Sequence, residues 1–238
     1  MKILTKSEAN PKLHKSTTQE WMATGIHLAP ADMSGYNVCS HASPVCKRFC
    51  LGRGGNGRYK RIRDARIAKT KLFYEDNAMF MRMLRSELHS FVAKCISLGT
   101  RPACRLNLTS DIVWEIKHPE LFDEFRCVQF YDYTKIVARV SPNWKLPSNY
   151  HLTFSHSEVN YKSCRKIMAT TPTNIAVVFN EDNVPNEWGY GFVKRPVING
   201  DDSDLRFLDP PHSVVALTPK GFLKKKRRKG LTSFSVSV

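Results

Sequence analysis

Six short runs of β-forming residues, spaced about 15 to 20 residues apart, restrict the fold of this chain more than any other feature. The runs are CRLNL (104–108), CVQFYDY (127–133), YHLTFS (150–155), NIAVVF (174–179), PVING (196–200) and SVVAL (213–217). Helical segments such as HPELFDEF (118–125) lie between some of them. Gaps of this length suit strands joined by crossover segments better than hairpins. The sequence therefore predicts an α/β fold with a mainly parallel sheet, forming an incomplete (β/α) barrel.

Two helices are predicted between a cysteine-rich N-terminal loop and the first of these runs. The segment GRYKRIRDARIAKTKLFYED (57–76) is typical of one helix. A second helix would be capped by Asp76 or Asn77 and closed by Gly99. Its apolar residues recur every three or four positions, at Phe80, Leu84, Leu88, Phe91 and Cys95. Cys95 therefore lies on the buried face, where we expect it to act as a core residue.

The composition indicates one folded domain. Hydrophobic residues make up 42% of the chain and charged residues 24%, which is typical of globular proteins and argues against disorder. We expect a single α/β domain over residues 1–223 and a basic tail over 224–238. No apolar stretch is long enough for a secretory signal or a membrane span, so we expect a soluble intracellular protein with no membrane partner.

The positive charge is concentrated in two segments. The net charge is +16, of which +9 falls between Lys47 and Lys71 and +6 in KKKRRK (224–229). Charge gathered in this way favours a polyanionic partner, either nucleic acid or nucleotides. The alternative is that the basic helix is a solvated face and the basic terminus a solubilising tail. The candidate nucleic-acid contacts are Arg58, Lys60, Arg61 and Arg63.

Three cysteines, Cys39, Cys46 and Cys50, have the spacing C-x6-C-x3-C. Pro44 lies between the first two and is expected to keep the segment in a non-helical loop that could wrap around a metal. In a reducing cytosol, thiols are more often metal ligands, nucleophiles or core residues than disulfide partners. Three closely spaced thiolates can hold a [4Fe-4S] cluster and leave one iron open for another ligand or a substrate. An iron–sulfur cluster on these three cysteines is therefore the favoured interpretation.

A structural zinc site is the alternative. Zinc normally takes four ligands, often from paired C-x2-C motifs, and this chain has no such motif. The fourth ligand would have to be His41, or one of Cys104, Cys127 and Cys164 brought close by the fold.

Polar residues follow four of the predicted strands, in NLTSD (107–111), YDYTK (131–135), SHSE (155–158) and NGDDSD (199–204). Each cluster alone is common in turns. In parallel α/β folds, however, the carboxyl ends of the strands lie on one face, where ligands bind, so four clusters together predict a polar cleft. Its candidate catalytic acids are Asp111, Asp132, Glu158 and Asp201, and its candidate cofactor-binding residues are Asn107, Ser110, Lys135 and Ser155.

Several segments taken together resemble a known family. They are LAPADMSGYNVCSHASPVCKRFCLGRG (28–54), RLNLTSDIVWE (105–115), YDYTK (131–135), LTFSHSE (152–158) and NGDDSDLRFLDPPHSVVAL (199–217). In this order they are similar to the bacteriophage gene product 88 family over most of the chain, although position 108 is Leu where the family often has Gly. The resemblance implies a phage-encoded protein made in the host bacterial cytoplasm, with Cys39, Cys46 and Cys50 as the family's cysteine triplet. It implies no particular reaction.

A more distant similarity is to radical S-adenosylmethionine enzymes, which combine a partial parallel barrel with a cluster held by three cysteines. Their usual spacing is C-x3-C-x2-C, whereas this chain has C-x6-C-x3-C. The difference changes the loop around the open iron and argues against S-adenosylmethionine as a cofactor.

Two functions from different classes follow from these features. The first is a phage-encoded iron–sulfur protein with redox or radical-type chemistry in a polar cleft. The second is a non-catalytic phage protein in which zinc or a cluster staples the fold and the basic segments bind nucleic acid.

Overall fold

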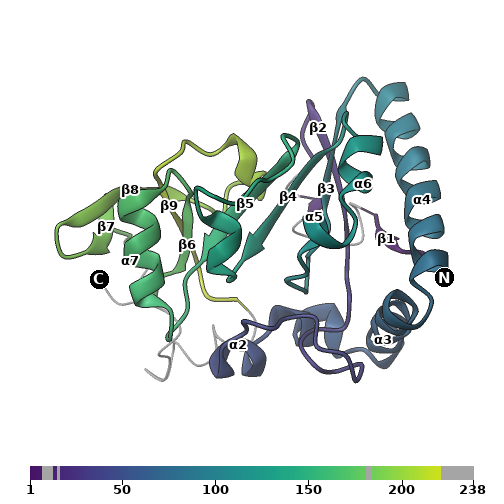
Figure 1. Cartoon of the computed structure of the whole chain (residues 1–238), viewed down its shortest axis with the longest axis horizontal. Coiled ribbons are helices and arrows are strands. Elements are labelled where there is room, and N and C mark those ends of the chain that lie inside the picture. Colours follow the sequence, from purple (N-terminus) through teal and green to yellow (C-terminus); the bar gives the residue numbers. More distant parts are fainter. Residues whose placement is uncertain (7–12, 15–16, 181–183, 221–238) are drawn as a thin grey trace. The chain divides into compact units, whose positions relative to one another are not determined.

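The computed structural model describes residues 1–6, 13–14, 17–180 and 184–220 (Figure 1). In this part of the chain, nine strands form a mostly parallel, mixed sheet, and the strands alternate with helices. The predicted α/β class and the mainly parallel sheet are therefore confirmed, while the incomplete barrel stays a prediction. The described residues form two compact units. The predicted basic tail, 224–238, lies outside the described residues.

The first unit comprises the described residues of 1–40, 56–132 and 146–151. Its strands are β1 (Leu4–Thr5), β2 (Trp21–Ile26), β3 (Arg101–Arg105) and most of β4 (Gln129–Thr134). β2 pairs in parallel with β3, and β3 with β4, whereas β1 is antiparallel to β2. All six residues of β2 are buried, as is typical of a central parallel strand.

Both predicted helices are present in this unit, as α3 (Lys60–Glu75) and α4 (Asn77–Ser97). The Asp76 carboxylate accepts a hydrogen bond from the Met79 amide at 2.9 Å and caps α4. Gly99 follows α4 with φ +65°, a left-handed conformation that glycine adopts without strain. The predicted apolar face is buried, including Cys95, except that Phe91 is only half-buried. The short helices α5 (Trp114–Lys117) and α6 (Glu120–Glu124) follow β3.

The second unit comprises 41–55, 133–145 and the described residues from 152 onward. Its strand order is β5-β6-β9-β8-β7, and only the β7–β8 pair is antiparallel. These strands are most of β5 (Tyr150–Ser155), and β6 (Ile175–Val178), β7 (Glu187–Tyr190), β8 (Val193–Asn199) and β9 (Val214–Leu217). Its α-helices are α2 (Pro44–Arg48) and α7 (Tyr161–Thr170).

Four short 3-10 helices complete the described elements. They are η2 (Leu51–Arg53), η3 (Gly55–Arg58), η4 (Val137–Val140) and η5 (Arg206–Leu208). No helix among the described residues is both long enough and apolar enough to cross a membrane.

Arg195 on β8 binds carbonyl oxygens at the C-terminal end of α7. Its buried guanidinium donates hydrogen bonds to the carbonyl oxygens of Met168 (2.8 Å), Ile167 (3.3 Å), Thr173 (2.5 Å) and Thr171. The last carbonyls of a helix have no partner within the helix itself. Arg195 therefore supplies donors to Ile167 and Met168 in the last turn of α7 and to Thr171 and Thr173 just after it.

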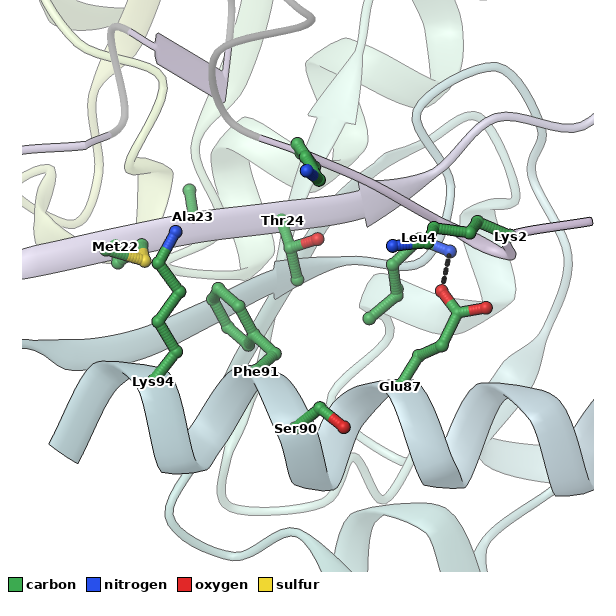
Figure 2. Close-up of a pocket in the computed structure, with 10 residues that line it drawn as sticks. Lys2, Leu4, Met22, Ala23, Thr24, Glu87, Ser90, Phe91 and Lys94 are labelled. Carbon is green, nitrogen blue, oxygen red and sulfur yellow. Dashed lines mark hydrogen bonds between the residues drawn. The ribbon is translucent and has the colours of Figure 1, made fainter. Parts of the chain in front are cut away.

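Two helices of the first unit hold the N-terminal strand in place. The Glu87 carboxylate on α4 accepts hydrogen bonds from the amides of Ile3 and Leu4, both at 2.8 Å. Figure 2 shows the Glu87 side chain reaching from α4 to the backbone at Leu4. The Lys69 ammonium on α3 donates to the Ile3 carbonyl at 3.3 Å. Burial, and to a lesser extent the nearby Arg66, lower the pKa of Lys69 to about 8, although Glu87 opposes the shift.

This lowered pKa predicts a pH-dependent stability. Below pH 8, Lys69 is charged in both the folded and the unfolded chain, so folding bears the full cost of burying an ammonium. Between about pH 8 and pH 10.5 only the unfolded state stays protonated, so stability should rise with pH. Relative to Lys69→Met, the native chain should gain about 2 kcal/mol in unfolding free energy between about pH 7.5 and about pH 9.5. Urea unfolding measures this difference.

The matched control is Lys71→Met, which removes an exposed lysine from the same helix. This variant and the native chain should differ by the same amount at both pH values. Parallel stability profiles for the native chain and Lys69→Met would show that Lys69 is not buried as a destabilised cation.

Candidate functional site

The second unit holds Cys46 and Cys50 at a short helix. Cys46 lies within α2, and Cys50 follows two residues after the helix ends. Ser43 caps α2, since its hydroxyl accepts a hydrogen bond from the Cys46 amide at 3.1 Å. The expectation that Pro44 keeps this segment non-helical is wrong. Pro44 occupies the first position of α2, where its missing N–H removes no hydrogen bond.

Glu158, three residues after β5, fastens this helix to the strand. Its carboxylate accepts a hydrogen bond from the Ser43 hydroxyl at 2.7 Å and another from the Val45 amide at 3.1 Å. A carboxylate is favoured at the positive N-terminal end of a helix, where amide groups lack partners. Glu158, predicted as a catalytic acid, therefore anchors the segment that carries Cys46 and Cys50 to the carboxyl end of β5.

The Cys50 sulfur lies in a half-buried position close to backbone donors. Burial raises the pKa of the Cys50 thiol, and the nearby Cys46 raises it as well. The Gly52 amide donates a hydrogen bond to the Cys50 sulfur at 3.3 Å, and this contact and one from the Arg53 backbone lower the pKa. N–H donors of this kind stabilise a thiolate, but here burial outweighs them. A bound cation would supply the remaining stabilisation.

The third predicted ligand, Cys39, belongs to the first unit. It is half-buried, and its thiol donates to the Thr109 carbonyl at 3.7 Å, while its amide donates to the Asn37 side chain at 2.9 Å. Among the residues that the structure describes, no group of three or more His, Cys, Asp or Glu side chains is arranged to hold a metal ion. The three-cysteine metal site therefore stays a prediction.

The cysteines considered as further zinc ligands differ in their surroundings. Cys104 and Cys164 are buried, and burial raises the pKa of Cys164 to about 12 and that of Cys104 well above its usual range. Cys127 and His41 are exposed. The two buried thiols therefore behave as small core residues.

Three residues of the predicted cleft meet in the first unit. The Asp132 carboxylate is fully buried and accepts hydrogen bonds from the Asn107 amide and the Tyr150 hydroxyl, both at 2.9 Å. Arg105 lies 3.9 Å from the same carboxylate. The Ser110 hydroxyl donates to the Asn107 side chain at 2.7 Å. The structure therefore brings Asn107, Ser110 and Asp132 together as partners of one another.

The Asn107 side chain is engaged on both sides. Its oxygen also accepts from the Ile112 amide (2.9 Å) and the Trp114 indole N–H (3.3 Å). Its nitrogen donates to the Ile112 carbonyl (3.0 Å) and to Asp132 (3.3 Å). These contacts hold the loop between β3 and α5. The half-buried Asp111 lies in the same loop, and its amide donates to the Val38 carbonyl at 2.8 Å.

The other two candidate cofactor-binding residues meet in the second unit. The Lys135 ammonium donates to the Ser155 hydroxyl at 2.7 Å. The adjacent His156 was absent from the predicted site, although it stands inside the polar SHSE segment. It is 8% exposed, and its Nδ1 has no hydrogen-bond partner among the described residues. Burial, and to a lesser extent Lys135, lower the pKa of His156 to about 4 against the opposing effect of Glu158, so the ring is neutral at pH 7.

Asp201, the fourth predicted acid, follows β8 and binds the residues just after β9 in the second unit. Its carboxylate accepts from the Thr218 amide at 2.8 Å, from the Thr218 hydroxyl at 2.7 Å and from the Lys220 ammonium. Burial raises the pKa of Asp201, but these hydrogen bonds outweigh burial and the net pKa is lowered. The four predicted acids thus divide equally between the units, with Asp111 and Asp132 in the first and Glu158 and Asp201 in the second.

The predicted nucleic-acid contacts lie at the beginning of α3 in the first unit. Arg58, Lys60 and Arg61 are exposed and Arg63 is half-buried. Lys60 forms an exposed ion pair with Asp64 at 2.7 Å, which contributes little to stability.

The saturated contacts of Asn107 predict a structural role. Asn107→Ala should leave the Trp114 indole and the Ile112 amide without partners in the interior and lower the unfolding free energy by about 2 to 4 kcal/mol. Ser110→Ala removes one of the same hydrogen bonds and should cost about 1 kcal/mol. Urea unfolding of both variants measures the difference. Equal losses in the two variants would contradict the view that Asn107 is the centre of this loop.

Comparison with known proteins gives one match. The profile described as gene product 88 matches residues 2–233. No curated protein and no solved structure shows significant similarity to the chain. None of these comparisons supplies a link to radical S-adenosylmethionine enzymes. Since the match covers nearly the whole sequence, the chain belongs to the gene product 88 family.

Proposed function

We propose that this chain is an iron–sulfur protein in which Cys39, Cys46 and Cys50 hold a [4Fe-4S] cluster. The observation that supports it best is the contact of Glu158 with Ser43 and Val45, because it fastens the cysteine segment to the end of a strand that carries polar residues. Metal centres with open positions are commonly found where strand ends and loops meet in α/β folds.

The chemistry of the donors suits such a cluster. Cys46 lies within α2 and Cys50 stands four residues further on, both half-buried, and Cys46 is near enough to raise the pKa of the Cys50 thiol. The Gly52 amide on the Cys50 sulfur is the kind of hydrogen bond that tunes cluster thiolates. Cys39 would be the third ligand, leaving one iron open to a substrate or a further ligand.

When bound, the cluster would supply one-electron chemistry. The polar residues near the end of β5 would serve the substrate. Lys135 offers a positive charge, Ser155 a hydroxyl, and the neutral ring of His156 an unpaired Nδ1 that can hold or accept a proton. The Glu158 carboxylate already accepts hydrogen bonds on both oxygens, so we assign it to positioning the cysteine segment and not to proton transfer.

Metal content tests this proposal directly. Protein purified without oxygen should be brown, absorb broadly toward the blue end of the visible and contain about four irons per chain. Cys46→Ser should lose the iron and the colour together. The matched control is Cys127→Ser, because Cys127 is exposed and outside the cysteine triplet, and it should keep both. A colourless protein with one zinc per chain would overturn the cluster and leave the structural zinc site.

The rate at which the same preparation loses iron tests the role of Glu158. Glu158→Gln leaves every thiol in place but weakens the carboxylate contacts with Ser43 and Val45, so iron should be lost faster to a chelator than from the native chain. Unchanged iron loss would show that Glu158 does not position the ligands.

A second function, nucleic-acid binding, is favoured by one observation. Arg58 at the end of η3 and Lys60 and Arg61 at the beginning of α3 are exposed, and the first turn of α3 contains no acidic residue. Exposed basic side chains in this arrangement can neutralise phosphates and release counterions. We infer that this face would contact the backbone of nucleic acid without reading its sequence.

Charge reversal tests the second function. Arg61→Glu combined with Arg63→Glu should weaken binding to DNA and reduce the slope of log affinity against log salt by about 2. The iron content should not change. The control is the double reversal of Lys162 and Arg165, two exposed residues on α7, which should leave the slope as it is. Equal effects of the two double reversals on the salt slope would show that DNA binding depends on the net charge of the protein and not on this face.

A further inference from the structure

We propose that Asn160, immediately before α7, is a positioning residue that fixes the turn after β5 and thereby places His156 and Glu158. The inference rests on the proposed function, because it concerns the residues that would serve the substrate and the cysteine segment. Asn160, His156 and Glu158 all belong to the second unit. Asn160 is half-buried and was not among the residues that the sequence pointed to.

The Asn160 side chain holds the peptide groups on both sides of His156. Its nitrogen donates a hydrogen bond to the Ser155 carbonyl at 3.0 Å, and its oxygen accepts one from the Ser157 amide at 2.7 Å. The His156 amide donates to the Ala176 carbonyl on β6 at 2.9 Å. Three of the four polar groups in these two peptide units therefore have partners, and the backbone that directs the His156 ring is fixed.

The contacts of Asn160 allow one orientation of its amide group. Exchanging the oxygen and the nitrogen would set two donors against each other at Ser157 and two acceptors against each other at Ser155. The Cys164 thiol, one turn further along α7, donates to the same Asn160 oxygen at 3.4 Å. Burial raises the pKa of this thiol to about 12, so the thiol keeps its proton at neutral pH and remains a donor.

An asparagine at this position usually serves the helix that follows it. Its side-chain oxygen commonly accepts a hydrogen bond from an amide in the first turn of the helix. The Asn160 side chain makes no such bond with the amides of α7. Its polar atoms bind the residues before the helix, so the side chain stabilises the turn in place of the helix.

Two side chains project from this turn. The Glu158 carboxylate binds the Ser43 hydroxyl and the Val45 amide at the beginning of α2. The His156 ring carries a buried Nδ1 that has no hydrogen-bond partner among the described residues. Loosening the turn would let the ring reach water and would weaken the hold on α2, so both side chains depend on Asn160.

Titration of the His156 ring by nuclear magnetic resonance, in the full-length chain, tests the proposal. Asn160→Ala should expose the ring to water, so the pKa of His156 should rise from about 4 to about 5, toward its ordinary value. The matched control is Asn149→Ala, which removes another half-buried asparagine that binds three backbone carbonyls, in the first unit. The control should lower the stability of the chain and leave the pKa of His156 unchanged.

The rate of iron loss gives a second measurement. Asn160→Ala should lose iron to a chelator faster than the native chain does. Adding Glu158→Gln should accelerate the loss no further, because both residues act on the cysteine segment through one turn. In a chain without iron the cluster proposal fails, and the pKa of His156 still decides the role of Asn160.

The native chain provides the answer if Asn160→Ala does not fold. Its Ser157 amide should exchange slowly with solvent, because the Asn160 side chain holds it in a hydrogen bond. Four results would each overturn the proposal. They are an unchanged His156 pKa in Asn160→Ala, an equal rise in Asn149→Ala, additive effects of Asn160→Ala and Glu158→Gln on iron loss, and rapid exchange of the Ser157 amide.

Discussion

A carboxylate can be buried in a protein only if donors surround it, and Asp132 imposes this condition on the first unit. It is fully buried, and its partners come from Asn107, Tyr150 and Arg105. Through Asn107, the same network reaches Ser110, Ile112 and Trp114. One buried charge thus determines the conformation of the loop after β3, and removing a central member would leave several polar groups unpaired.

In the second unit, too, acidic side chains are surrounded by hydrogen-bond donors. Glu158 satisfies the beginning of α2 and Asp201 closes a turn, so these acids are engaged by the protein itself. His156 differs, because it is nearly buried and its Nδ1 has no hydrogen-bond partner among the described residues. Native proteins leave few buried polar atoms in this condition, and such atoms often face a ligand. Polar residues at strand ends therefore include several that hold loops, whereas His156 keeps one buried nitrogen without a partner among the described residues.

The sequence predicted the fold better than the roles of its polar residues. All six predicted strands are present, since apolar runs bounded by turns mark buried parallel strands, although CRLNL is shifted to β3 (Arg101–Arg105). β2 escaped prediction because WMATGI (21–26) is buried throughout and shows no alternation of polar and apolar residues. The polar strand ends in the sequence pointed to Lys135 and Ser155 as members of one site, whereas the roles of Glu158 and Asn107 depend on which donors the fold places opposite them. No local pattern carries that information.

The contact of Arg195 with α7 has a consequence for how this region opens. The guanidinium on β8 serves carbonyls from Ile167 to Thr173, so these carbonyls lose a donor once β8 moves away. Detaching the strand would expose these carbonyls together with a buried positive charge. The helix end and the strand should therefore open as one cooperative unit, and their amide hydrogens should exchange with solvent at a common rate although more than twenty residues separate them along the chain.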